Sequence, residues 1–192
     1  MSHGLFRPVL GILGLALLGL QGLLPAGPPA DTRPVATATA FVVLSGDDSA
    51  VTEEQLLRVT DDEAWTDLWR RHRGLPTDKP YNRYYDEATC PLVDFESCMV
   101  IALLRGDTTN CAGLRLVEVD DDGRRLRLRV KAKSYQTMAA SIDPEDMQGD
   151  AVRPYAFVVL PRSDLPVQVE FDRSGLGQRE PRWVREGELA GR

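Results

Sequence analysis

Histidine and cysteine are scarce in this chain of 192 residues, which contains two histidines and three cysteines. Cys90, Cys98 and Cys111 include no C-x-x-C pair, and His72 is the only histidine beyond the first thirty residues. A structural zinc site needs about four such ligands at short spacings, and a thiol nucleophile needs a base beside it. Motifs such as G-x-S-x-G or H-E-x-x-H are also missing. We therefore expect no enzyme activity, metal or cofactor.

Positive charge is in deficit, because 23 lysines and arginines face 29 acidic residues and the net charge is -6. Binding to a nucleic acid requires clustered cations, so we expect no nucleic-acid partner. Four cations recur at every second residue and therefore share one strand face. They either bind an anionic partner or form ion pairs with neighbouring strands, and we favour the ion pairs. These cations are Arg125, Arg127, Arg129 and Lys131.

Long apolar runs are missing except for Val9 to Leu24, which follows a short positive segment and precedes Pro25 and small residues. This order is typical of a secretory signal peptide, which we assign to residues 1–30. We expect its removal, with retention as an N-terminal anchor as the alternative. Residues 31–40 predict a linker, and no later run is long enough to span a bilayer. The predicted location is extracytoplasmic, in the periplasm, in the cell envelope or as a secreted protein.

The rest of the chain predicts an α+β domain over residues 41–174 that is mostly antiparallel β. Alternating or continuous apolar runs separated by turn residues indicate about seven short strands. Polar residues dominate 175–192, which we interpret as a frayed C-terminal tail. The predicted strands cover residues 38–45, 55–59, 99–104, 114–119, 126–130, 155–160 and 167–171.

One amphipathic helix is predicted between Asp61 and Gly74. Trp65, Leu68, Trp69 and His72 fall at i, i+3, i+4 and i+7 and so share one face. Such a face usually packs a helix on a sheet, and we favour that interpretation over an aromatic platform for a ligand. His72 ends the helix, where we expect either a cation near the negative end of the helix dipole or a residue at the edge of the buried face.

A hairpin is predicted at Asp122-Gly123, because Asp-Gly between alternating strands favours a two-residue turn. This register sets Val119 opposite Leu126 and Asp120 opposite Arg125, so apolar pairs and ion pairs lie on separate faces. The turn requires a positive φ at Gly123.

Three cysteines in an exported chain predict one disulfide and one remaining thiol. Cys98 begins a predicted buried strand, where a cysteine behaves as a small apolar residue. Cys90 and Cys111 both lie in predicted loops, so their sulfur atoms can meet without breaking a strand ladder. We favour a bridge between Cys90 and Cys111, and Cys90 with Cys98 remains open.

Several short motifs, in order and spacing over residues 41–171, resemble the PrcB family. This family of exported bacterial domains is named after a protein that stabilises a surface protease complex. The resemblance implies an accessory or binding domain without known catalytic residues. The matching stretches are Glu63-Ala64-Trp65-Thr66-Asp67-Leu68-Trp69, Val93-Asp94-Phe95, Met99 to Gly106, Gly113, Pro154-Tyr155 and Leu160-Pro161.

The sequence and the resemblance together predict an exported, non-catalytic interaction module. It would bind or stabilise a protein partner, of which a protease complex is one candidate. The alternative is an extracytoplasmic domain that binds a small ligand or calcium through one of two loops. The first loop holds Tyr81, Tyr84 and Tyr85, and the second holds Asp143, Asp146 and Asp150.

Overall fold

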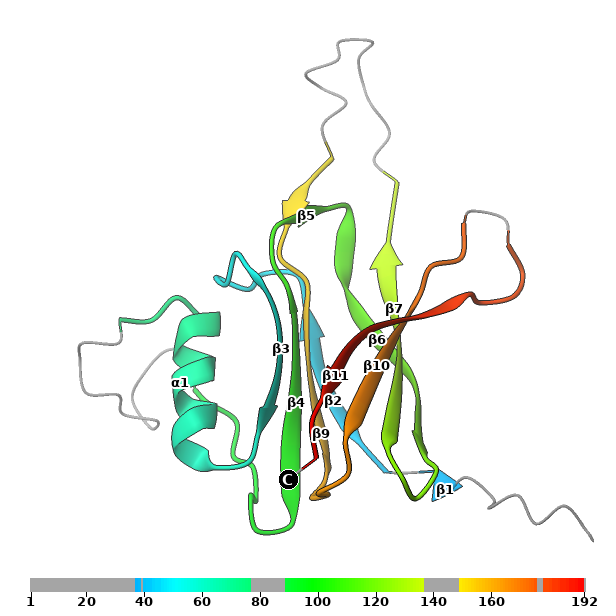
Figure 1. The fold of residues 1–192 in the computed structure, drawn as a ribbon. Helices are drawn as coiled ribbons and strands as arrows, with labels where there is room; N and C mark the ends of the chain where they lie inside the picture. The colour runs from blue at the N-terminus through cyan, green and yellow to red at the C-terminus, as the bar shows by residue number, and fades with distance from the viewer. Residues whose placement is uncertain (1–36, 39, 77–88, 137–148, 176–177, 192) are drawn as a thin grey trace, which may run out of the picture. The chain divides into compact units, whose positions relative to one another are not determined.

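The structure is a computed structural model, which describes residues 37–38, 40–76, 89–136, 149–175 and 178–191. The chain divides into two compact units, residues 1–33 and 34–192, and the described residues belong to the second. They form one α-helix and two main β-sheets (Figure 1), which confirms a β-rich fold with a single helix. The helix is α1 (Asp62–His72).

The strands form a five-stranded sheet, a four-stranded sheet and a short two-stranded ribbon. Neighbouring strands are antiparallel except for β7 and β10, which are parallel. The five-stranded sheet has the order β1 (Thr37–Ala38), β6 (Cys111–Asp121), β7 (Leu126–Ser134), β10 (Val167–Asp172) and β11 (Trp183–Leu189). The four-stranded sheet has the order β2 (Val42–Gly46), β9 (Tyr155–Pro161), β4 (Cys98–Arg105) and β3 (Glu54–Val59). The ribbon pairs β5 (Thr108–Thr109) with β8 (Ala151–Val152).

Alternation along β4 explains how the layers are held together. Met99, Ile101 and Leu103 enter the core between the two main sheets. The intervening side chains, such as Ala102 and Leu104, enter a second core beneath α1. Successive side chains of a strand point to opposite faces, so this apolar strand is buried on both sides, as its sequence predicted. Figure 1 shows the resulting order of layers, with α1 on one face of the four-stranded sheet and the five-stranded sheet on the other.

The helix follows its predicted pattern and packs through its aromatic face. Asp61 caps the first turn, because its side chain accepts a hydrogen bond from the Ala64 N–H at 2.8 Å. Trp65 is fully buried, contacts Phe157 edge-on at 5.1 Å between ring centroids, and donates from Nε1 to the Pro91 carbonyl at 2.8 Å. Trp65 therefore belongs to the core, as favoured from the sequence.

The seven predicted strands are present, but the expected count was too low, because the described residues also form β1, β5, β8 and β11. Two of these additions correct the interpretation of polar segments. Trp183–Leu189, predicted to be part of a frayed tail, forms β11 at the edge of the five-stranded sheet and pairs with β10. Its side chains are mostly exposed, so it lacks the apolar alternation that marks the other strands. Thr37–Ala38, placed in the linker, form β1 and pair with the end of β6.

The β6–β7 hairpin is present, but its predicted register was wrong by two residues. Asp120 pairs with Arg127 instead of Arg125, and Val119 pairs with Leu128. The turn is longer than two residues, because Asp122 Oδ1 accepts from the N–H groups of Arg124 and Arg125, both at 2.9 Å. Beside the turn, this shift of two keeps the side chains on their predicted faces. The bulge at Val117 reverses the faces before it, so that Val117 is exposed while Leu114 and Leu116 are buried. Gly123 has the predicted positive φ, of 76°.

Candidate binding cleft

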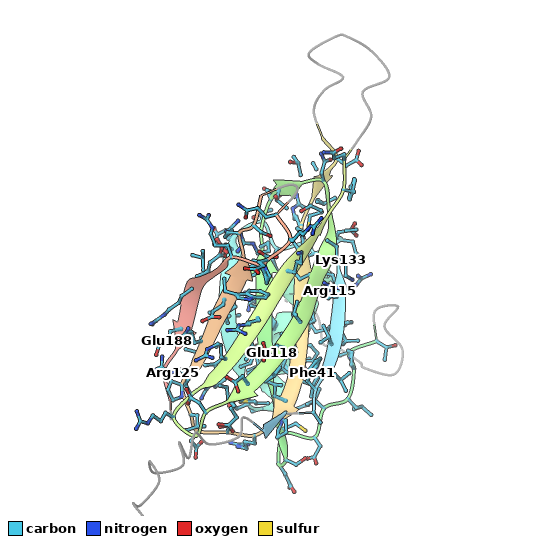
Figure 2. The ribbon with its side chains drawn as sticks, turned by 90° about the vertical axis from the view of Figure 1, so that its right-hand side faces the viewer. Phe41, Arg115, Glu118, Arg125, Lys133 and Glu188 are labelled. Atoms are coloured by element: carbon cyan, nitrogen blue, oxygen red, sulfur yellow. The ribbon has the colours of Figure 1, made fainter. Side chains whose placement is uncertain are left out.

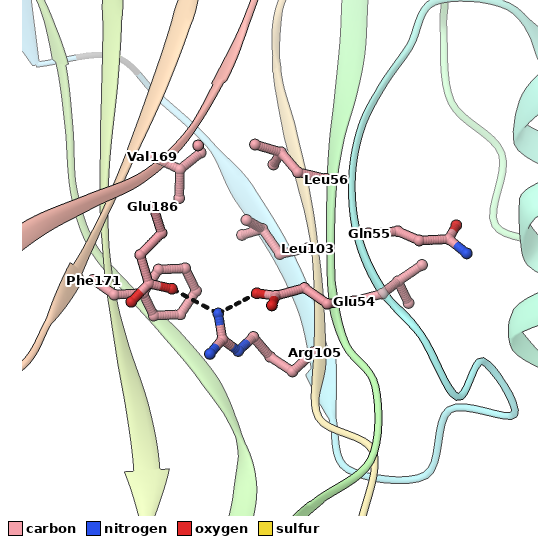
Figure 3. A pocket seen from close by; sticks show the side chains of 10 residues that line it. Glu54, Gln55, Leu56, Leu103, Arg105, Val169, Phe171 and Glu186 are labelled. Atoms are coloured by element: carbon pink, nitrogen blue, oxygen red, sulfur yellow. Dashed lines mark hydrogen bonds and ion pairs between the residues drawn. The ribbon is translucent and has the colours of Figure 1, made fainter.

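The two sides of the β-sandwich differ, and the side formed by β3 and β11 is filled except for a small pocket of about 30 Å³ beside Arg105 (Figure 3). Arg105 Nη1 on β4 lies 2.5 Å from Glu54 on β3 and 2.7 Å from Glu186 on β11. Its guanidinium carbon lies 4.6 Å from the ring centroid of Phe171. A Cβ added at Gly187 would lie 2.5 Å from Leu56 Cδ2, so the strands approach closely. One largely shielded arginine thus links both sheets.

The opposite side, between β2 and β6, is bonded at Leu114 by Ser45, and β1 pairs with the other end of β6. Ser45 Oγ donates to the Leu114 carbonyl at 2.5 Å and accepts from the Leu114 N–H at 3.0 Å. Gly113, at φ 107°, permits this approach, because a Cβ there would lie 3.0 Å from the Gly46 carbonyl oxygen. The serine therefore satisfies the backbone of Leu114 in place of a neighbouring strand.

Beside this contact lies a hollow of about 380 Å³, here called the binding cleft. Its β2 wall is the inward face of alternate residues, Phe41, Val43 and Ser45, and Phe41 is 41% exposed. Its β6 wall is made by Leu114 and Leu116. The walls are thus mainly apolar and open to solvent at Phe41.

Two exposed cations, Arg115 and Lys133, complete the lining of the binding cleft. Among the described residues, neither forms an ion pair. In Figure 2 both are labelled on the outer face of the five-stranded sheet, toward the border where Phe41 is also labelled. The cleft therefore combines apolar walls with a positive rim on a chain that is acidic overall.

Three other cations of β7, Arg127, Arg129 and Lys131, are paired with acids of β6 and β10, as favoured from the sequence. Glu170 on β10 serves two of them, at 3.6 Å from Arg127 and 3.1 Å from Arg129. Lys131 Nζ lies 2.8 Å from Asp172. This contact and hydrogen bonds from Ser174 hold the pKa of the Asp172 carboxyl far below its ordinary value. This part of the sheet face is neutralised internally and offers little to an anionic partner.

The backbone of β6 also faces the cleft. The N–H and C=O groups of Leu114 point to the β2 side, so alternation directs those of Leu116 to the same side. The register shifts at Val117, which is 45% exposed, and β1 covers only Asp120 and Asp121. The chain itself borders this edge, because Ala38 pairs with Asp120 at one end and Ser45 bonds to Leu114 at the other.

A second group that the sequence did not indicate is the pair formed by His72 and Ser49. His72 is fully buried, and its Nδ1 lies 3.1 Å from Ser49 Oγ. Burial lowers its pKa from 6.5 to about 4, helped by the charge of Arg73 and opposed by that of Asp48. The side chain is therefore neutral at pH 7, which corrects the expectation of a cation. Ser49 is only 3% exposed, so its hydroxyl is inaccessible to a substrate in this conformation.

The predicted bridge between Cys90 and Cys111 is not formed in the structure. Cys90 is buried in the core beneath α1. Cys111 is buried at the start of β6, opposite Ser134, and its thiol points to the Gly113 carbonyl at 3.3 Å. Cys98 begins β4 and is partly exposed. The prediction failed because both supposed loop cysteines are packed as small apolar residues in separate places.

The calcium alternative falls mostly outside the described residues, as do Tyr81, Tyr84, Tyr85, Asp143 and Asp146. Asp150 is described, and it bonds to Asn110 and Tyr135 at 2.9 and 3.1 Å. Within the described ranges, no three His, Cys, Asp or Glu side chains are grouped to hold a metal ion. In the same ranges, no helix has the length and apolar character needed to cross a membrane.

Compared with known proteins, the chain matches no family model, no curated protein and no solved structure.

Proposed function

We propose that this chain is an exported, non-catalytic interaction module that binds a protein partner at the binding cleft between β2 and β6. The observation that carries the proposal is the cleft itself. Apolar walls from Phe41, Val43 and Leu116 lie beside two exposed cations, and no described acid neutralises those cations. Apolar centres with charged rims are the usual anatomy of protein-binding surfaces.

The contrast between the two sides of the sandwich supports the location. Arg105 closes the β3–β11 side with two carboxylates, whereas the β2–β6 side keeps an apolar hollow beside Ser45. An apolar hollow that is open to solvent is unfavourable unless something covers it. The resemblance to the PrcB family, the predicted signal peptide and an extracytoplasmic location fit a partner outside the cytoplasm, of which a protease complex is one candidate.

The test is capture of the partner from envelope extracts of the native host with tagged protein. Charge reversal at the rim, Arg115→Glu with Lys133→Glu, is expected to abolish capture of any partner seen with the wild type. The matched control, Arg124→Glu with Arg179→Glu, makes the same change in net charge at two exposed arginines that do not line the cleft.

Circular dichroism must show that both double variants remain folded. Equal capture by the wild type and the rim variant would contradict the proposal. Capture lost in both variants would also contradict it, because it would indicate a response to net charge rather than to the cleft.

A further inference from the structure

We infer that the binding cleft receives the C-terminal end of its protein partner, with the terminal carboxylate at the rim cations and the last side chain, an apolar one, in the hollow. The inference rests on the proposed function and specifies what the same site recognises. Three features carry it: the closure of the cleft at both ends by this chain itself, the two rim cations that no described acid compensates, and the apolar walls beside them.

The closure of the cleft at both ends decides how a partner can enter. Ser45 bonds to β6 at one end, and β1 pairs with β6 at the other. The segment from Ala38 to Ser45 therefore borders this edge of β6, and the middle of another polypeptide cannot pass between the two. The hollow is open to solvent where Phe41 is 41% exposed. A chain end fits such a hollow, because it can enter from the solvent side and stop there.

A chain end also combines the two kinds of chemistry that line the cleft. Its last residue carries a carboxylate and a side chain on the same Cα atom, so an anion and an apolar group arrive together. The α-carboxyl group has an ordinary pKa of about 3.5 and is therefore ionised at neutral pH. The guanidinium of Arg115 can bind a carboxylate through two parallel hydrogen bonds, and Lys133 adds a second positive charge. Capture of a terminal carboxylate is a known mode of peptide recognition.

The cations and the exposed aromatic ring occupy different parts of the cleft, which sets the orientation of the bound end. Arg115 comes directly after the residue that Ser45 bonds, so it lies toward that end of the cleft. Phe41 precedes Ser45 by four residues, a length of about 14 Å at roughly 3.4 Å per residue. In Figure 2, Arg115 and Lys133 are accordingly labelled together and Phe41 apart from them. The carboxylate thus belongs near the end that Ser45 closes, with the apolar side chain directed toward Phe41.

Other cations of the same sheet face do not offer this site. Arg127, Arg129 and Lys131 are already compensated by acids of their own sheet. A further carboxylate there would lie beside like charges, whereas at the rim it meets no described acid. The positive rim also excludes the opposite end of a chain, because an N-terminal amine would place a like charge beside two cations.

Fluorescence anisotropy tests the inference on protein purified from the export compartment after expression of the full chain. The probe is the peptide Gly-Ser-Gly-Ser-Ala-Leu, labelled at its N-terminus and with a free C-terminal carboxylate. Three control peptides carry the same label. The first has a C-terminal amide, and the second ends in Ser in place of Leu. The third, Gly-Ser-Gly-Ser-Glu-Leu with a C-terminal amide, keeps one negative charge but moves it to an internal side chain.

We expect the probe to bind at least about tenfold more tightly than each control peptide. Arg115→Glu with Lys133→Glu should weaken its binding about tenfold or more, and added salt should weaken it as well. Arg124→Glu with Arg179→Glu, which makes the same change in net charge away from the cleft, should leave the Kd unchanged.

The apolar wall is tested by Phe41→Ala, which removes an exposed ring from the lining. Binding of the probe should weaken about threefold or more, because less apolar surface is buried by its last side chain. The matched control is Leu92→Ala, at an exposed apolar residue that does not line the cleft, and it should leave the Kd unchanged.

Equal binding of the probe and either amidated peptide would overturn recognition of a chain end. Equal binding of the peptide that ends in Ser would overturn the apolar contact. Binding that survives rim reversal would overturn the location. If no peptide binds at protein concentrations up to about 1 mM while envelope capture still requires Arg115 and Lys133, the chain-end mode is wrong and the proposed function stands.

Discussion

The Nδ1 atom of His72, at the end of α1, lies 3.1 Å from Oγ of Ser49, in the loop that follows β2. The imidazole ring also contacts Tyr155, with 4.2 Å between ring centroids. Two further bonds join the same elements, from the Ala50 N–H to the His72 carbonyl at 2.8 Å and from Arg73 to Asp48 at 3.0 Å. A neutral, buried histidine thus fixes the end of the helix to the four-stranded sheet.

This arrangement predicts that the protein loses stability in mild acid. The pKa of His72 is about 4 in the folded chain and takes its ordinary value of 6.5 on unfolding, so the unfolded chain takes up a proton first as the pH falls. The contribution is fully present above pH 6.5 and declines toward pH 4, by up to about 1.4 kcal/mol per pH unit. Urea unfolding measured at several pH values in this window checks the slope.

The control is His72→Gln, which keeps a side chain able to bond Ser49 and removes the titrating group. Its free energy of unfolding should depend less on pH in the same window. Asp172 does not account for a pH slope between 6.5 and 4. Its pKa in the folded chain is lowered from 3.8, so its contribution to the free energy of unfolding is lost as the pH falls below that value. Identical pH slopes for the two proteins would contradict the assignment.

The features predicted correctly are those that depend on local pattern. The helix was found because four residues at helical spacing share a face, and β4 was found because its apolar run is buried on both sides. The hairpin was placed correctly, but its register was not. Side-chain alternation has a period of two, so the shift by two residues leaves the faces beside the turn unchanged, and the pattern gave no sign of the bulge at Val117.

The binding cleft could not be predicted because its walls come from separate parts of the chain. Phe41 and Val43 lie about seventy residues before Leu114 and Leu116, and they meet only after two sheets have formed and stacked. The pair of His72 and Ser49 has the same origin, with a separation of 23 residues. Helical spacing placed His72 on the buried face but gave no information on what that face contacts.

A second prediction concerns Arg105 at the closed side of the sandwich. Arg105→Ala removes its bonds to Glu54 and Glu186 and its contact with the Phe171 ring. We expect a loss of about 1–2 kcal/mol in the free energy of unfolding, since the side chain is largely shielded and contacts both sheets. Chemical denaturation gives the value.

The matched control for Arg105 is Arg124→Ala, at an exposed turn position, which should change stability by about 0.5 kcal/mol or less. A double-mutant cycle with Glu186→Gln isolates the pair. The loss from Glu186→Gln should be smaller in the Arg105→Ala background than in the wild type. Additive losses would show that the two side chains do not stabilise each other.

The hairpin turn gives a third prediction. Gly123 has φ 76°, and a Cβ added there meets no atom within 4 Å, so substitution tests the backbone conformation alone. Gly123→Val should cost about 1–2 kcal/mol, because a β-branched residue is strained at positive φ. Gly123→Asn should cost less, because asparagine tolerates the left-handed region. Thermal melts of the two variants compare the costs directly, and equal melting temperatures would contradict the turn conformation.

The last prediction separates the observed edge strand from the frayed tail that composition suggested. Removal of residues 183–192 deletes β11, and with it the pairing along β10 and the Glu186 carboxylate that bonds Arg105. A loss of about 2–3 kcal/mol should lower the Tm by about 5–10 °C in a chain of this size. The exposed β10 edge, which carries Val167, Val169 and Phe171, should also promote aggregation. The control is Arg185→Ala, which keeps the strand and removes an exposed side chain, and which should leave the Tm nearly unchanged. A truncated protein with the wild-type Tm would mean that the segment does not belong to the sheet in solution.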